Sequence, residues 1–170
     1  MKKINFEEAF VSFVNLMPGP GMFINSKAEE KVNTMTLGWA SMGNYWGKSV
    51  LIAMVRHSRY TYDLITKSGE FTISMPLELT KEIENALSFC GSNSGRDVDK
   101  ATACGLTWQD SASLDTPIIA ECALHIDCKI IMPQDMDGNA LEKSIYDVYY
   151  PTHDLHTFFA GEIIETYYTK

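Results

Sequence analysis

The stretch from Asn33 to Met42 alternates between two kinds of residue. Large apolar side chains (Met35, Leu37 and Trp39) fall on one parity, and the other parity carries small or hydroxyl-bearing residues. Because successive side chains of a β-strand point to opposite faces, this period of two predicts a strand with one apolar face and one small, polar face. Residues 33–42 are therefore expected to be extended rather than helical.

A second strand is predicted directly after the first. Residues 43–48 contain two glycines and an asparagine, which favour a turn. Ser49–Val55 is an almost continuous apolar run of strand length, which is typical of a strand that is buried on both faces.

The residues that follow this run predict a helix with an anion-binding start. Ser58 is a suitable N-cap for a helix over residues 59–67, with Thr61 in its first turn. The first turn of a helix has unpaired backbone N–H groups and the positive end of the helix dipole. With Arg56 and Arg59 at the junction, this segment can hold an anion.

The rest of the chain predicts short helices between strands. Residues 1–17 are expected to hold an N-terminal helix, and residues 134–156 a long loop or insertion. Further helices are expected over residues 79–89 and 100–103, and strands over residues 22–26, 70–75, 106–108, 118–132 and 157–168. The short connections favour antiparallel pairing, and 170 residues suffice for one domain. We expect a single, mainly β domain that forms a small barrel with helices outside.

Composition excludes several classes of function. The net charge is −8 and no basic stripe is present, which argues against a nucleic-acid partner. No apolar run approaches the roughly 20 residues of a membrane helix, and Glu7 and Glu8 interrupt any apolar signal segment. We therefore expect a cytoplasmic protein without membrane contact.

Cysteine and histidine spacing predicts neither a metal site nor a disulfide. The four cysteines include no C-x-x-C pair, and we expect reduced thiols. Cys122 and Cys128 lie in one predicted strand, roughly 20 Å apart, which is too far for a disulfide. His153 and His156 fall in the expected loop, where their geometry is unconstrained. Neither a G-x-G-x-x-G fingerprint nor a P-loop is present.

Each remaining feature also has a simpler interpretation. Thr34 and Thr36 can face solvent, Arg56 and Arg59 can be a solvated pair of charges, and residues 91–99 can be an ordinary mobile connection. Taken one at a time, these patterns do not decide a function.

Together, three motifs resemble one protein family. They are N-T-M-T-x-x-W at Asn33–Trp39, R-x-S-R-Y-T at Arg56–Thr61 and S-G-R-D-V-D-K at Ser94–Lys100. In this order they resemble the flavin reductase-like, FMN-binding split-barrel family, in particular its flavoredoxin branch. The sequence departs from the family pattern at His57, where proline is expected, and in residues 141–157, which have no counterpart.

The resemblance implies a mostly antiparallel split β-barrel with a six-stranded core, which forms a homodimer with FMN near the interface. It implies that residues 33–41 lie along the isoalloxazine ring and that residues 56–61 hold the phosphate. Lys100 is expected to reach the flavin or its phosphate. The cofactor-binding residues expected on this basis are Asn33, Met35, Thr36, Ala40, Ser41, Arg56, Ser58, Tyr60, Thr61 and Lys100. No catalytic side chain is expected, because hydride transfer to the flavin needs no protein acid or base.

Three functions follow as alternatives. The first is an NAD(P)H-dependent flavin reductase, with NADH or NADPH as electron donor. The second is a flavoredoxin-type FMN electron carrier that has a redox partner protein and no nicotinamide turnover of its own. The third is a binding module that uses the barrel for another ligand. Yellow colour and NAD(P)H consumption distinguish the three.

Overall fold

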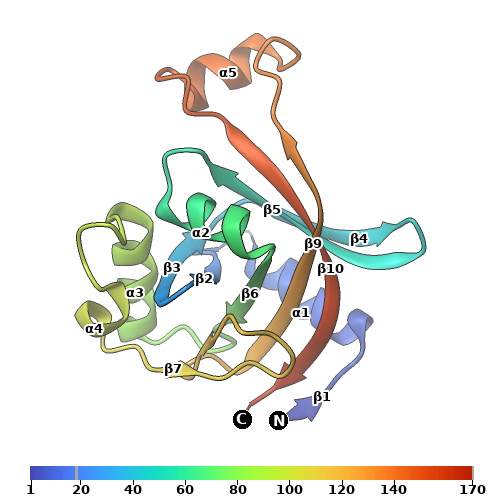
Figure 1. The fold of residues 1–170 in the computed structure, drawn as a ribbon, viewed down its shortest axis with the longest axis vertical. Coiled ribbons are helices and arrows are strands. Elements are labelled where there is room, and N and C mark those ends of the chain that lie inside the picture. The colour runs from blue at the N-terminus through green and yellow to red at the C-terminus, as the bar shows by residue number, and fades with distance from the viewer. Residues whose placement is uncertain (18, 170) are drawn as a thin grey trace.

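The computed structural model describes residues 1–17 and 19–169, which fold around one strongly curved sheet (Figure 1). The helices of this described part are α1 (Phe6–Leu16), α2 (Tyr60–Ser68), α3 (Lys81–Ser92), α4 (Lys100–Cys104) and α5 (Lys143–Tyr149). Its strands are β1 (Lys2–Lys3), β2 (Met22–Ala28), β3 (Lys31–Leu37), β4 (Ala40–Tyr45), β5 (Lys48–Arg56), β6 (Glu70–Met75), β7 (Trp108–Gln109), β8 (Ile118–Ile119), β9 (Leu124–Asp135) and β10 (His156–Tyr168).

The main sheet is antiparallel throughout. Its order is β3-β2-β6-β9-β10-β5-β4, and β1 pairs with β10 outside this path. The two short strands β7 and β8 form a separate ribbon. The expected mainly β split barrel with short helices is confirmed, and the sheet extends the expected six-stranded core with the two-residue β1 and the edge strand β4.

The strand predicted over residues 33–42 is wrong as one element. β3 ends at Leu37 and β4 begins at Ala40, and these two consecutive strands lie at opposite ends of the sheet order. The chain crosses from one edge to the other at Gly38 and Trp39, where the carbonyl of Trp39 accepts a hydrogen bond from the amide of Met54. The alternation of apolar and small residues therefore continues through Gly38 and Trp39, and it does not indicate that one strand ends there and another begins.

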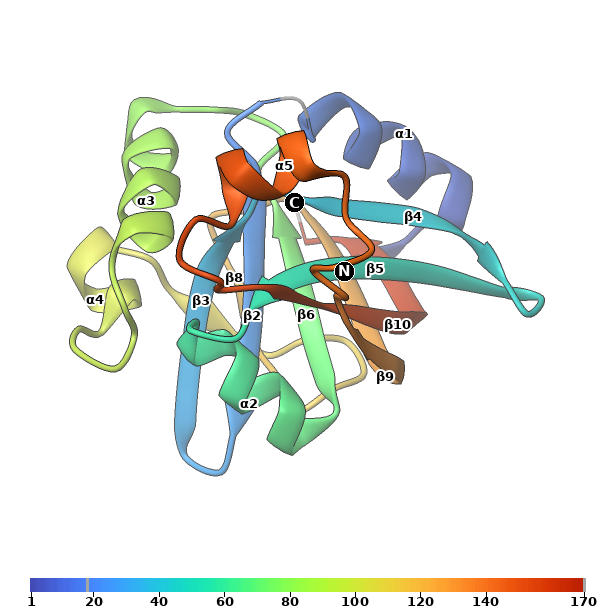
Figure 2. The same cartoon turned by 90° about the horizontal axis from the view of Figure 1, so that it is seen from above.

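The predicted turn between β4 and β5 is confirmed as a two-residue hairpin loop. Tyr45 pairs with Lys48, and the two residues between them, Trp46 and Gly47, have φ angles of 54° and 73°. Positive φ at both positions matches the twist of the flanking strands, and glycine accepts it without strain. The hairpin extends away from the barrel, as its long β4–β5 ribbon in Figure 2 shows.

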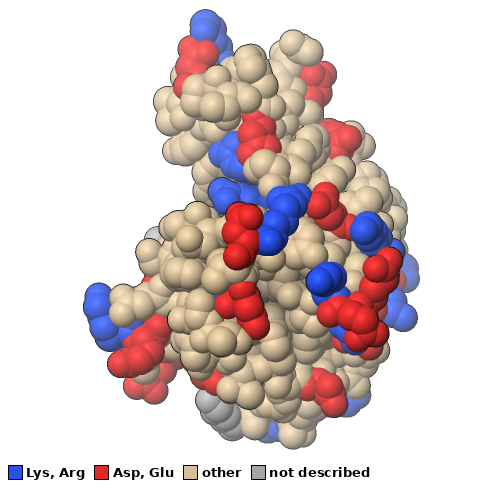
Figure 3. All heavy atoms as spheres, turned by 60° about the vertical axis from the view of Figure 1, so that its left-hand side comes forward, with Lys and Arg blue, Asp and Glu red and all other residues tan. Residues whose placement is uncertain are grey.

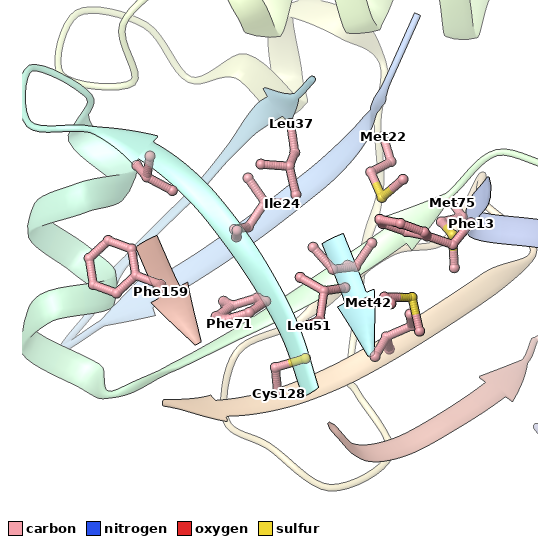
Figure 4. Close-up of a cluster of buried hydrophobic side chains, with 14 of the residues drawn as sticks. Phe13, Met22, Ile24, Leu37, Met42, Leu51, Phe71, Met75, Cys128 and Phe159 are labelled. Atoms are coloured by element: carbon pink, nitrogen blue, oxygen red, sulfur yellow. The ribbon is translucent and has the colours of Figure 1, made fainter. Parts of the chain in front are cut away.

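The core lies inside the curved sheet. Figure 4 shows Phe13 of α1 beside Met22 and Met75, so the N-terminal helix closes one end of the barrel. Gly161 on β10 admits the ring of Phe71, since a Cβ there would lie 2.8 Å from that ring. A second cluster packs α3 and α4 against the outer face of β2.

Three of the described helix starts carry side-chain caps, and one predicted strand is divided. Asn5 caps α1, Thr80 caps α3 and Asp99 caps α4, each by accepting a hydrogen bond from a first-turn amide. The extended run predicted over residues 118–132 is wrong as one strand, because a turn at residues 120–123 separates β8 from β9. No helix in the described residues is long and apolar enough to cross a membrane.

Residues 136–155, here called the arm, connect β9 to β10. The arm projects beyond the barrel at the top of Figure 1. Residues 134–156 were expected to form a long loop or insertion, and the structure adds that this segment contains the helix α5. This helix buries none of its residues, although Ile145, Val148 and Tyr149 recur at helical spacing.

Candidate functional site

A cavity of about 230 Å³ lies where β3, the end of β5, the start of α2, the end of α3 and the start of β10 meet. Figure 3 shows Lys and Arg side chains gathered in the hollow beside the arm. Eight of the ten predicted cofactor-binding residues line this cavity: Asn33, Met35, Thr36, Arg56, Ser58, Tyr60, Thr61 and Lys100. Segments far apart in sequence therefore contribute to one site.

Ala40 and Ser41 do not line the cavity. They lie on β4, at the opposite edge of the sheet from β3. Their inclusion depended on a continuous strand after Thr36, and the crossing at Gly38 removes that continuity. Gly38 and Trp39 line the cavity instead.

One wall is built on the buried side chain of Asn33. Its amide nitrogen donates to the hydroxyl of Thr61 over 2.8 Å, which joins β3 to the first turn of α2. Gly95 packs directly on this amide, because a Cβ at Gly95 would lie 1.9 Å from Asn33 Oδ1. A glycine is required at this close approach of loop, strand and helix.

The start of α2 differs from the prediction. Arg59, not Ser58, holds the N-cap position, and no side chain caps the helix. Ser58 is instead bonded to the arm. The amides of Tyr60 and Thr61 have no acceptor among the hydrogen bonds of the described residues. These two N–H groups and the dipole of α2 make the cavity's floor a site for an anion.

Arg59 is the more available of the two arginines at this junction. Its guanidinium has one long hydrogen bond, 3.5 Å to the carbonyl of Gly91. Arg56, by contrast, donates to the carbonyls of Asp154 and Tyr149 over 2.6 and 3.0 Å and lies 4.9 Å from the ring centre of Tyr150.

Lys100 is buried beneath the cavity. Its ammonium donates to the carbonyls of Thr34 and Cys90, each over 2.9 Å. Burial lowers the pKa of Lys100 below its usual range. The lysine therefore ties β3 to the end of α3 as well as lining the cavity.

Residues 93–99 are held against α2 by the contacts of Arg96. Arg96 forms a 2.6 Å ion pair with Asp63 and donates to the carbonyl of Ser58 over 2.9 Å. Its guanidinium also lies 5.2 Å from the ring centre of Tyr60. This loop thus holds the start of α2 in place from outside.

The wall next to the arm is aromatic. The ring centres of Trp39 and Tyr149 lie 5.1 Å apart, and those of Trp39 and His156 lie 5.2 Å apart. Burial, with the nearby charge of Arg56, lowers the pKa of His156 to about 4, so this imidazole is neutral at neutral pH.

Sequence reasoning missed several residues of the cavity. Arg59 and Trp39 were within the motifs but not among the selected residues, and His156 had no local signal. The missed lining residues include Gly38, Trp39, Arg59, Gly91, Asn93, Ser94, Gly95 and His156. Only the three-dimensional meeting of β10 with β5 brings His156 to this place.

The cysteines are free thiols, as expected, and no Cys122–Cys128 disulfide forms. Cys90 lines the cavity, and burial raises its pKa to about 12. It is therefore protonated and unreactive at neutral pH. Within the described part of the chain, no group of three or more His, Cys, Asp or Glu residues is arranged to hold a metal ion.

The fold and the site define a small split-barrel protein with a cavity beside the start of a helix. Residues 14–170 match the sequence model of the flavin reductase like domain. The chain belongs to this flavin reductase-like family.

Individual relatives agree with this assignment. A protein of Archaeoglobus fulgidus is 31% identical over 136 residues, covering 79% of this chain and 64% of the relative. Flavoredoxin from Methanosarcina acetivorans is 27% identical, with a TM-score of 0.65 over 86% of this chain and 66% of that one. The chain thus spans slightly less than two thirds of each of these relatives. An FMN-binding domain of a flavin reductase-like enzyme from Shewanella baltica shares the fold, with a TM-score of 0.68 and 21% identity over 99% of this chain and 78% of that one.

Proposed function

We propose that this chain binds FMN in the cavity and acts as an NAD(P)H-dependent flavin reductase. The observation that carries the proposal is the start of α2, where the amides of Tyr60 and Thr61 and the guanidinium of Arg59 are available beside the cavity. The Shewanella relative is described as FMN-binding. A dianionic phosphate needs such a local positive site in a chain of net charge −8.

The residues present fit a flavin mononucleotide. The phosphate would be held by Arg59, by the two amides and by the R-x-S-R-Y-T turn, and the ring system would lie toward Asn33, Thr36 and Trp39. A cavity of about 230 Å³ is smaller than the roughly 300–1,000 Å³ of enclosed ligand sites. Part of the flavin would therefore extend past the cavity mouth.

Such an open site supports a homodimer. Tyr45 and Trp46 at the tip of the β4–β5 hairpin are 42% and 67% exposed, and β4 is the edge strand of the described sheet, with one edge unpaired. Exposed aromatic side chains beside a free strand edge favour contact with a second copy. The four free thiols suit a reducing compartment, and we place the protein in the cytoplasm.

The bound FMN would supply the hydride and electron chemistry. The chain's own contribution is to bind and orient. Asn33 and Thr61 keep β3 and α2 in register, and Lys100 holds the end of α3 against β3. The neutral His156 and Trp39 shield the cavity from water on the side of the arm.

A flavoredoxin-type electron carrier is the second candidate, because solved structures of flavoredoxins are similar to this chain. In that case a redox partner protein, rather than NADH or NADPH, exchanges electrons with the flavin. The two candidates share the FMN site and differ only in nicotinamide turnover.

The test is an absorbance spectrum of protein mixed with FMN and desalted, followed by anaerobic addition of NADH and NADPH. Retained flavin with bleaching by either nucleotide supports the reductase. Retained flavin that is bleached by dithionite but not by NADH or NADPH supports the carrier, and no retained or titratable flavin contradicts both.

A matched pair of variants tests the site itself. Arg59→Ala should weaken FMN about 10-fold to 100-fold, because a charge-assisted contact contributes roughly 1.5–3 kcal/mol. Lys67→Ala removes the same charge from the last turn of α2 and should leave FMN affinity unchanged. Equal effects of the two variants would contradict the assignment of the helix start as the phosphate site.

A further inference from the structure

One segment of the arm satisfies three hydrogen-bonding groups of the R-x-S turn. The amide and the hydroxyl of Ser58 donate to the two carboxylate oxygens of Asp154, over 3.1 and 2.6 Å. The guanidinium of Arg56 donates to the main-chain carbonyls of Asp154 and Tyr149. These are groups that the turn offers to a phosphate.

The contact at Ser58 has the chemistry of an anion site. A carboxylate that accepts from a backbone N–H and a hydroxyl beside the start of a helix uses the bonds that a phosphate oxygen would use. A dianionic phosphate and a carboxylate repel each other and cannot share these two donors. Asp154 and a phosphate are therefore alternative occupants of Ser58.

We propose that Asp154 is an internal competitor for the phosphate of the flavin, and that it makes the arm a gate on the anion site. This inference rests on the proposed function. Binding of FMN displaces Asp154 from Ser58. The same displacement releases the Arg56 guanidinium from the carbonyl of Asp154, so that this donor can contact the phosphate while the bond to the carbonyl of Tyr149 remains. Riboflavin, which lacks the phosphate, leaves the gate closed.

The contacts of the arm allow its turn before Asp154 to move away from Ser58. α5 buries none of its residues, and Val148 and Tyr149 are 66% and 48% exposed. The arm's deepest anchor is Tyr150, which is 2% exposed and whose hydroxyl is 2.8 Å from His156 Nδ1. Tyr150 lies four residues before Asp154, so the intervening turn can move while the anchor stays.

Asp154→Asn tests the competition, with Asp147→Asn as the matched control. Both variants remove one negative charge from the arm, but Asp147 pairs with Lys143 on the outer side of α5 and does not contact the site. FMN and riboflavin are titrated by flavin fluorescence at low ionic strength. We expect Asp154→Asn to bind FMN about 10-fold to 100-fold more tightly than wild type, with riboflavin unchanged. Asp147→Asn should bind both flavins as wild type does.

Several results would overturn the proposal. Unchanged or weaker FMN binding by Asp154→Asn would show that Asp154 does not compete with the phosphate. An equal gain for FMN and riboflavin, or the same gain in Asp147→Asn, would show a general effect of charge or fold.

A second readout needs no flavin. In a Trp46→Phe, Trp108→Phe background, Trp39 is the remaining tryptophan, and it packs on Tyr149 of the arm. Inorganic phosphate should change its emission, whereas chloride at equal ionic strength should not, and Asp154→Asn should shift the midpoint to lower phosphate. No phosphate dependence would contradict the gate. If wild type bound neither flavin, the proposed function would fail, and this titration would still decide whether Asp154 competes with phosphate.

Discussion

Substitution of Gly95 by alanine should damage the flavin site while leaving the barrel intact. An alanine Cβ would lie 1.9 Å from Asn33 Oδ1, 2.7 Å from Asn33 Cγ and 3.1 Å from Cδ1 of Tyr60. The first two distances are well inside the roughly 3.5 Å of a favourable contact. Either the loop moves off α2 or the Asn33 side chain rotates away from Thr61.

The free-energy cost of each response can be estimated. Overpacking of a tight site costs about 1–3 kcal/mol. Loss of the Asn33–Thr61 hydrogen bond leaves two buried polar groups unpaired, which costs about 1–3 kcal/mol. Because the cavity wall carries this strain, we expect Gly95→Ala to weaken FMN and riboflavin alike by about 10-fold or more. The melting temperature should fall by roughly 2–12 °C, since each 1 kcal/mol of the cost of about 1–3 kcal/mol corresponds to roughly 2–4 °C in a domain of this size.

A double-mutant cycle with Asn33→Ala gives the decisive measurement. Asn33→Ala removes the amide that the new methyl group would strike, so the double variant should bind flavin no more weakly than Asn33→Ala alone. Additive losses in the cycle, or wild-type affinity of Gly95→Ala, would refute the idea that this contact shapes the site.

Four further predictions concern other parts of the molecule. Arg56→Ala should weaken FMN about 10-fold to 100-fold and riboflavin hardly at all, and equal weakening in paired titrations would remove Arg56 from the phosphate site. Sedimentation should show a homodimer at micromolar concentration, which Trp46→Glu dissociates; a flavin-loaded wild-type monomer would contradict the shared-site model. Cys90→Ser and Cys104→Ser should retain NAD(P)H oxidation close to wild type, and loss of turnover with full FMN content would reveal a redox thiol. His156 has a pKa of about 4 in the fold against an ordinary 6.5, so the unfolded chain takes up its proton first as the pH falls. Its contribution to the free energy of unfolding should therefore drop by about 3 kcal/mol between pH 6.5 and 4. When His156→Gln is unfolded in urea at a series of pH values, its free energy of unfolding should lack that part of the pH dependence. A pH profile equal to that of wild type would contradict the burial argument.

Two failures of sequence reasoning have different physical causes. The α2 cap was assigned to Ser58 because serine commonly caps helices, but a partner about 100 residues away, Asp154, takes its hydroxyl. Local propensity cannot register a competing long-range partner. The helix α5 was missed because it has only seven residues, so the helical spacing of Ile145, Val148 and Tyr149 extends over about one turn and is too short to distinguish a helix from a loop.

The sequence by itself determined the elements with strong local signals. These are the strands β5, β6 and β10 and the turn that contains Trp46 and Gly47. It also contained three motifs in order, which identified the family, and eight of the ten residues that we predicted to bind the cofactor line the cavity.

Only the tertiary structure decided how these elements meet. The crossing at Gly38 sends β3 and β4 to opposite edges of the sheet and takes Ala40 and Ser41 away from the cavity. Pairing of β10 with β5 brings in His156, and the arm brings Asp154 onto Ser58. The period of a strand depends on neighbours two residues away, whereas its pairing depends on partners anywhere in the chain, so the first can be read locally and the second cannot.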